Sequence, residues 1–211
     1  MTPERRHPRR PAMLDPAAAD QLQGDIDPAL RSEVAHTTAN AVVHPGRAAE
    51  DPQVVARLVR LVEAEGLDTV AGMWADSPAT TLPGALWRLY VLRAWVRRDP
   101  ATIAERYRMG VARAEVHEVV AGVASPEGPQ EVSRVVDAVL SGVFVGDLAV
   151  ALERGAAFCR VLATGAALDA DQVEDHDSHL AGRMTQGASG LVRTAEELET
   201  AAALWRADRL D

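Results

Sequence analysis

The chain has no lysine: all 22 of its basic residues are arginine. Without lysine, the protein has no side-chain amine to form a Schiff base with a substrate, to act as a lysine general base, or to bind nucleotide phosphates from a P-loop. The abundance of arginine, alanine, valine and glycine is typical of a gene from a GC-rich genome. The lysine-dependent classes of enzyme chemistry are therefore excluded.

Cysteine is almost absent as well, because Cys159 is the only one among the 211 residues. A single cysteine can form neither an internal disulfide nor a zinc site made of cysteines, so nothing in the composition implies an oxidising compartment. Cys159 lies in the apolar segment 147–163. We interpret it as a small buried hydrophobic side chain and not as a reactive thiolate.

Long apolar runs are missing too. The most apolar segment, 82–96, is interrupted by Arg88 and Arg93 and is shorter than the roughly 20 residues that a membrane span needs. The basic residues near the start are not followed by the apolar stretch of a secretory signal. The sequence therefore predicts a cytoplasmic protein without membrane insertion.

Charge is distributed unevenly along the chain. Residues 1–10 carry a net charge of +3, whereas the rest of the chain carries −12. Residues 1–11 also contain three prolines and almost nothing apolar, which predicts a disordered, basic, Arg/Pro-rich arm. Because the acidic body repels phosphate groups at long range, any contact with nucleic acid would need a local basic surface.

Helix signals recur through the remaining residues, 12–211. Asp-Pro pairs at 15, 27, 51 and 99 each precede a helix-forming run, in which aspartate caps the helix and proline fits its first position. A capping box formed by Thr194 and Glu197 predicts a final helix over 194–206. The spacing of apolar residues predicts further helices over 29–43, 54–62, 67–75, 84–98, 100–108, 113–122, 129–141 and 147–163.

No stretch shows the sustained alternation of polar and β-branched residues that marks a strand. Short, turn-rich connections such as 124–129 favour antiparallel neighbouring helices. No linker is long enough to separate two domains. We therefore predict an all-α fold, in which residues 12–211 form a single compact multi-helix bundle behind the disordered arm.

Arginine and aromatic residues concentrate in the segment 81–113, which carries a net charge of +5 and half of the chain's eight aromatic residues. Both residue types supply large contact areas at low entropic cost, which favours a partner-binding surface. The alternative is that Trp87, Tyr90 and Trp95 fill the core, with arginines along its edges. Arginines four residues apart share a helix face. The predicted partner-binding residues are Arg93, Arg97, Arg98 and Arg106.

A helix-turn-helix interpretation applies to the segment 103–120, with Gly110 at the turn. Ala104 lies six residues before this glycine, farther than the usual motif places it, and two glutamates would face the DNA. The segment supports DNA binding as an alternative function. The residues that would contact DNA are Arg108, Arg113 and His117.

Five carboxylates and two histidines occupy residues 169–179. Histidines three residues apart on a helix, such as His176 and His179, can share a metal ion, and Asp175 could complete the ligand set. The spacing differs from that of the common catalytic zinc helix, whose histidines are four apart, and the order of a calcium loop is missing. The alternative interpretation is a solvated acidic segment, since charge runs usually face solvent.

Three blocks of the chain resemble known proteins. They are residues 82–100 (LPGALWRLYVLRAWVRRDP), residues 118–165, which begin EVVAGVASPEGPQEV, and residues 191–211 (LVRTAEELETAAALWRADRLD). The chain resembles a family of uncharacterised all-helical proteins of high-GC actinobacteria. This resemblance implies a bacterial cytoplasmic setting and attaches no activity and no catalytic residue.

The sequence contains no Gly-x-Ser-x-Gly elbow, no dinucleotide-binding glycine fingerprint and no P-loop, so it indicates no catalytic residues and no cofactor. The leading prediction is a non-enzymatic regulatory or adaptor protein that binds a protein partner. A DNA-binding regulator is the alternative, and a metal-dependent enzyme is the third hypothesis. A homodimer formed through the apolar stripe of the 194–206 helix is a further prediction.

Overall fold

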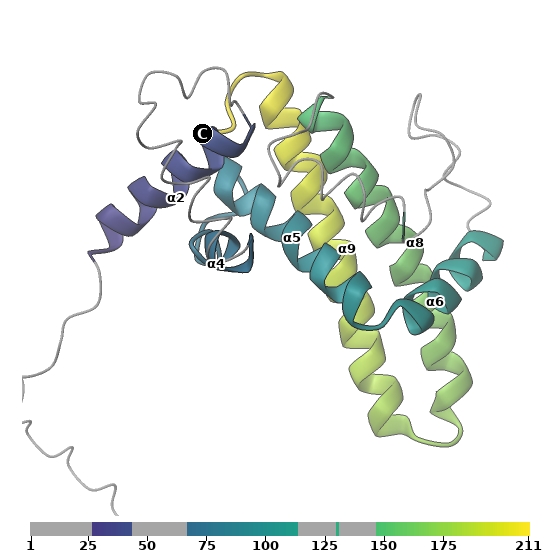
Figure 1. The fold of residues 1–211 in the computed structure, drawn as a ribbon. Coiled ribbons are helices and arrows are strands. Elements are labelled where there is room, and N and C mark those ends of the chain that lie inside the picture. Colours follow the sequence, from purple (N-terminus) through teal and green to yellow (C-terminus); the bar gives the residue numbers. More distant parts are fainter. Residues whose placement is uncertain (1–26, 44–66, 114–129, 131–146) are drawn as a thin grey trace, which may run out of the picture.

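The computed structural model describes residues 27–43, 67–113, 130 and 147–211 (Figure 1). The described residues contain no strand, which confirms the predicted all-α fold, and none of their helices is long and apolar enough to cross a membrane. The arm, the predicted helix over 54–62 and most of those over 113–122 and 129–141 lie outside the described residues. The helices are α2 (Pro28–Val43), α4 (Leu67–Gly72), α5 (Leu82–Arg98), α6 (Pro100–Arg113), α8 (Leu148–Glu174) and α9 (Ser178–Arg206).

Two of the predicted Asp-Pro helix starts lie in the described part of the chain, and both are confirmed. The Asp27 carboxylate accepts a hydrogen bond from the Ala29 amide at 2.9 Å, at the start of α2. Asp99 does the same for the Thr102 amide at 3.2 Å, at the start of α6. These bonds satisfy backbone donors that the first turn of a helix leaves free. The pairs at 15 and 51 lie outside the described residues.

The longest elements are α8 and α9, with 27 and 29 residues, which run antiparallel as a helical hairpin. Arg160 binds both carboxylate oxygens of Glu199 at 2.7 and 2.8 Å, which joins the two helices, and Arg206 pairs with Glu153. In Figure 1, the ends of α8 and α9 near residue 175 extend beyond α5 and α6. Helices α5 and α6 pack against this hairpin, and α2 and α4 pack against α5.

The prediction that the last helix starts at Thr194 is wrong. Helix α9 begins at Ser178, where the Asp177 carboxylate caps the Leu180 amide at 2.9 Å, and the Thr194 hydroxyl donates to the Gly190 carbonyl inside the helix. The glycines and small polar residues of 182–190 have weak helix propensity, which hid this part of the helix in the sequence. Packing of Ala181 and Ala188 against α8 stabilises it instead.

Helix α5 packs against both α9 and α8 and completes the core. Leu89 of α5 lies next to Gly155 of α8 and Leu198 of α9, and all three are buried. Leu198 belongs to the apolar stripe of 194–206 that the sequence offered as a homodimer surface, together with Ala201 and Ala202. The stripe is buried within this chain, so that prediction of a dimer surface is wrong.

Helices α6 and α8 cross at two glycines. A Cβ atom added to Gly110 of α6 would lie 2.0 Å from the Val161 carbonyl oxygen, and one added to Gly165 of α8 would lie 1.8 Å from the Arg106 carbonyl oxygen. The missing side chains let the two backbones touch. Residue 110 therefore lies inside a continuous helix, and the prediction of a turn at Gly110 is wrong.

The N-terminal side of the fold is joined to the bundle by buried polar contacts. The indole N–H of Trp74 donates to the Thr38 hydroxyl of α2 at 3.0 Å, and this hydroxyl in turn donates to carbonyls in its own helix. At the other end of the chain, the Leu82 amide donates to the Asp211 carbonyl oxygen at 2.5 Å. The first bond joins α2 to the segment after α4, and the second ties the first turn of α5, where the candidate site begins, to the C-terminal residue.

A candidate binding groove between α5 and α9

A hollow of about 370 Å³ lies between α5 and α9. Its volume is within the range of ligand-binding pockets. Two tryptophans, Trp87 and Trp95, stand two helical turns apart on the same face of α5 and supply aromatic surface. We call this cavity the first hollow. It is lined by Ala75, Ser77, Trp87, Arg88, Val91, Leu92, Trp95, Cys159, Leu191, Arg193, Thr194 and Glu197.

An ion pair crosses the first hollow. Arg88 of α5 donates through Nε to Glu197 of α9 at 2.5 Å and through Nη1 to the Gly84 carbonyl at 2.9 Å. Both side chains are partly buried. The guanidinium is therefore held in place by groups of this chain and forms a fixed polar wall. Glu197, predicted to close a capping box, joins α9 to α5 instead.

Arg193 is the second arginine of the first hollow. Its side chain is exposed, and it forms no ion pair or hydrogen bond with any described residue. A guanidinium beside tryptophan rings can bind a carboxylate by two parallel hydrogen bonds while its planar face stacks on an aromatic ring. The first hollow thus combines apolar surface with one uncommitted positive charge.

The Cys159 thiol lies at the inner end of the first hollow and is fully buried. Burial raises the pKa of this thiol to about 12, because the apolar surroundings disfavour the thiolate. The thiol is therefore protonated at neutral pH, as expected for the small hydrophobic residue that the sequence predicted. Its contribution to the groove is shape and apolar contact.

A second hollow, of about 210 Å³, adjoins the first, and the two share Trp95 and Leu191. Arg106 of α6 lines it while donating to Asp169 of α8 at 3.0 Å. The two hollows lie next to each other along α9, with Trp95 and Leu191 between them, and we call the two together the groove. The second hollow is lined by Trp95, Arg106, Ala166, Arg183, Met184, Gly187 and Leu191.

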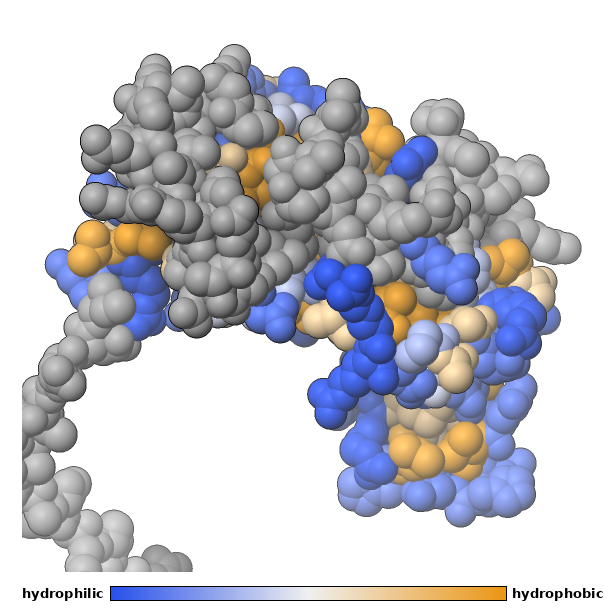
Figure 2. Space-filling view, viewed as in Figure 1, coloured by the Kyte–Doolittle hydropathy of each residue, from blue (hydrophilic) through white to orange (hydrophobic). Residues whose placement is uncertain are grey.

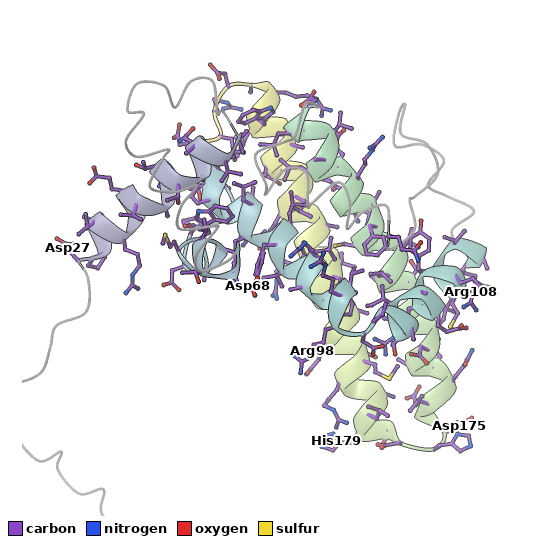
Figure 3. The ribbon with its side chains drawn as sticks, in the orientation of Figure 1. Asp27, Asp68, Arg98, Arg108, Asp175 and His179 are labelled. Carbon is purple, nitrogen blue, oxygen red and sulfur yellow. The ribbon has the colours of Figure 1, made fainter. Side chains whose placement is uncertain are left out.

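The structure divides the predicted partner-binding arginines into two groups. Arg106 lines the second hollow, and Arg98 is exposed at the C-terminal end of α5, eleven residues after Trp87 and thus on the same helix face (Figure 3). Arg93 and Arg97 follow a different face, about half a turn from Trp95. Arg93 lies near Tyr90, whose hydroxyl donates to Asp68 at 2.7 Å. These four arginines therefore do not form one patch.

The three aromatic residues also serve different purposes. Trp87 and Tyr90 stack with ring centroids 5.5 Å apart, and both are only partly buried, as is Trp95. The largest buried side chains are Trp74 and Phe158 instead. The alternative interpretation, in which Trp87, Tyr90 and Trp95 fill the core, is thus only partly right: all three border the core, and Trp87 and Trp95 leave aromatic surface in the groove.

Two residues of the DNA-binding hypothesis, Arg108 and Arg113, line neither hollow. Arg108 and Arg113 are exposed on α6, where Arg108 pairs with Glu105 at 2.5 Å. His117 lies outside the described residues, as does the rest of the predicted recognition helix. Because α6 runs without a break through Gly110, the first half of the motif is a single helix in contact with α8.

The residues of the metal-site hypothesis lie at the tip of the α8–α9 hairpin. Asp175 ends α8, whereas His179 lies in the first turn of α9, and the two lie on opposite sides of the tip in Figure 3. His176 lies in the connection between the helices, and the Nδ1 atom of His179 is 3.1 Å from Arg183 Nη1. The described residues contain no group of three or more His, Cys, Asp or Glu side chains placed to hold a metal ion.

The sequence analysis named only one of the two arginines in the second hollow and neither lining residue of central α9, Leu191 or Arg193. Helix α9 was predicted to begin after both, so their spacing relative to Arg183 carried no signal. Recognising one helix over 178–206 would have placed Arg183, Gly187, Leu191 and Thr194 on one face, at intervals of three to four residues.

No protein-family model, no curated protein and no solved structure matches this chain. The resemblance to helical actinobacterial proteins stays a prediction.

Proposed function

We propose that this chain is a non-enzymatic regulatory adaptor that binds a protein partner in the groove between α5 and α9. One observation carries the proposal: Trp87, Trp95 and the uncommitted Arg193 share one hollow. Tryptophan and arginine contribute most to binding energy in protein interfaces when they lie together in a pocket that excludes water. The partner supplies an apolar group for the hollow and a carboxylate for Arg193.

Two exposed valines provide a matched test. Val91 lines the first hollow and is 43% exposed, whereas Val111 of α6 is 46% exposed and lines neither hollow. The tagged protein, its Val91→Glu variant and its Val111→Glu variant are cross-linked and purified from the native organism, and bound proteins are identified. We expect a defined partner with the parent protein and with Val111→Glu, and its loss with Val91→Glu.

Circular dichroism and thermal melts of the two variants show whether each is folded, which both should be because their valines face solvent. A partner that binds all three proteins equally would refute the assignment to the groove. DNA binding and metal-dependent catalysis stay predictions, since no observation on the described residues favours either over partner binding.

A further inference from the structure

We propose that the partner's binding element is an acidic amphipathic α-helix, which inserts two large apolar side chains seven residues apart, one into each hollow of the groove. The inference rests on the proposed function and specifies the chemistry of the partner. Three observations support it: the spacing of the two hollows, the arginines along their rim, and the glycines of α9, which leave the helix backbone uncovered.

The spacing of the hollows matches the repeat of a helix. The α9 residues that line the first hollow are centred near residue 194, and those that line the second are centred near 186. At a rise of 1.5 Å per residue, the two centres are roughly 11 Å apart along α9. Side chains at positions i and i+7 of a helix lie on one face and are separated by about the same distance. A helix lying along the groove therefore brings one anchor to each hollow.

The rim of the groove supplies positive charge although the chain as a whole carries −9. Arg193 lies at the first hollow, Arg183 at the second, and Arg98 is exposed on the α5 side. Arg193 and Arg98 form no ion pair with any residue in the described ranges. Acidic residues flanking the apolar anchors would meet these guanidinium groups, whereas a basic or nucleic-acid partner would not be favoured by them.

The backbone of α9 also leaves room for close approach. Gly187 lines the second hollow, and apart from the adjoining backbone of α9 itself, no atom lies within 4 Å of where a Cβ of Gly187 or Gly190 would stand. In the same chain, Gly110 and Gly165 let two helices touch, because their missing side chains accept a neighbouring carbonyl. Figure 2 shows hydrophobic residues exposed among hydrophilic ones on the hairpin beyond α5.

Another hollow lies on a different face of the hairpin but offers less. It measures about 350 Å³ and is lined chiefly by alanine, serine and threonine, with Arg160 already bound to Glu199. It contains no aromatic side chain among the described residues. The α5–α9 groove is the surface that combines aromatic contact with available charge.

The test uses fluorescence anisotropy with the full chain and a dye-labelled synthetic helix of about 18 residues, rich in glutamate and alanine, with leucines at i, i+4 and i+7. The control peptide has the same composition, with the last leucine moved from i+7 to i+5, which turns that side chain to another face. We expect saturable binding of the first peptide and at least about tenfold weaker binding of the second.

Protein variants locate the binding and test the charge. Val91→Glu should weaken the i, i+7 peptide at least about tenfold, and Val111→Glu should leave its affinity unchanged. Arg193→Glu should weaken it about three- to tenfold and reduce its dependence on salt, while Arg209→Glu, at an exposed arginine outside both hollows, should do neither.

Equal binding of the two peptides, or no binding of either, overturns the helix proposal. If a partner protein is nevertheless captured from cells in a Val91-dependent manner, the proposed adaptor function stands and only the helical form of the partner's element is wrong. If neither the peptide nor any cellular protein depends on Val91, both proposals fail.

Discussion

The substitution Gly165→Ala tests whether the α6–α8 crossing depends on backbone contact. The new Cβ would lie 1.8 Å from the Arg106 carbonyl oxygen, whereas ordinary contacts at a Cβ are 3.4–4 Å. A carbonyl within a helix cannot rotate away, so the helices must separate by about 1.5 Å. Separation would weaken the Arg106–Asp169 ion pair at 3.0 Å and the stacking of Tyr107 on Phe158 at 5.3 Å.

The magnitude follows from two opposing effects. Overpacking of this kind costs about 1–3 kcal/mol, or more when a backbone must move. Alanine has a better helix propensity than glycine, which returns up to about 1 kcal/mol. We expect a net loss of about 1–2 kcal/mol in the free energy of unfolding, measured from urea titrations followed by circular dichroism. The double variant with Gly110→Ala should lose less than the two single losses combined, because one separation accommodates both side chains.

Gly187→Ala is the matched control, because it makes the same chemical change at a position where, apart from the adjoining backbone of α9, no atom lies within 4 Å of the new Cβ. At residue 187 the only effect is the better helix propensity of alanine compared with glycine, so the free energy of unfolding should rise by about 0.5–1 kcal/mol. If Gly165→Ala were no more destabilising than Gly187→Ala, the description of α6 and α8 as touching backbones would be wrong.

Three further predictions concern other parts of the fold. Cys159 should react with iodoacetamide at pH 8 at least about 100-fold more slowly in the native protein than in urea, because burial raises the pKa of its thiol to about 12; equal rates would show that the thiol is accessible. Thr38→Val should lower the free energy of unfolding by about 1–3 kcal/mol, since the buried Trp74 N–H loses its acceptor, and an unchanged urea midpoint would contradict this role. The hydrogen bond from Arg206 lowers the pKa of Glu153 in the folded state. The ionised carboxylate therefore stabilises the fold at every pH above its unfolded pKa, and this stabilisation is lost as the pH falls through the lower pKa of the folded state. The difference in stability between the parent protein and Glu153→Gln should accordingly be largest at neutral pH and shrink below about pH 4, as measured by urea midpoints across this range.

The sequence predicted the start of a helix correctly where a single capping residue determines it. Asp27 and Asp99 each supply a cap whose partner is two or three residues away, so the chemistry is visible in a short window. The start of α9 was misplaced because contacts with α8 outweigh the low propensity of its glycines. Gly110 was assigned to a turn because a glycine at a turn and a glycine at a helix crossing look the same in one sequence.

The candidate site could be predicted only in its composition. The enrichment of arginine and aromatic residues over 81–113 predicts a binding surface, which stays a prediction; in the structure α5 supplies one wall of the first hollow, and of the four predicted arginines only Arg106 lines either hollow. The other wall of the groove comes from α9, about a hundred residues later in the chain. Arg93 and Trp95 are only two residues apart, but they lie on different faces of α5 and therefore do not share a surface. Neither the distant wall nor the pairing of Arg88 with Glu197 can be read from local spacing.

Arg106 contributes two chemically separate groups to this protein. Its carbonyl oxygen lies against Gly165, while its guanidinium lines the second hollow. Every residue type has the carbonyl, so a substitution at 106 would remove the ion pair with Asp169 and change the lining of the second hollow, while the backbone contact with Gly165 could remain. The glycine opposite has no such freedom. At this crossing, side-chain identity therefore matters on one helix only as an ion pair and a lining group, whereas on the other helix the absence of a side chain is what permits the contact.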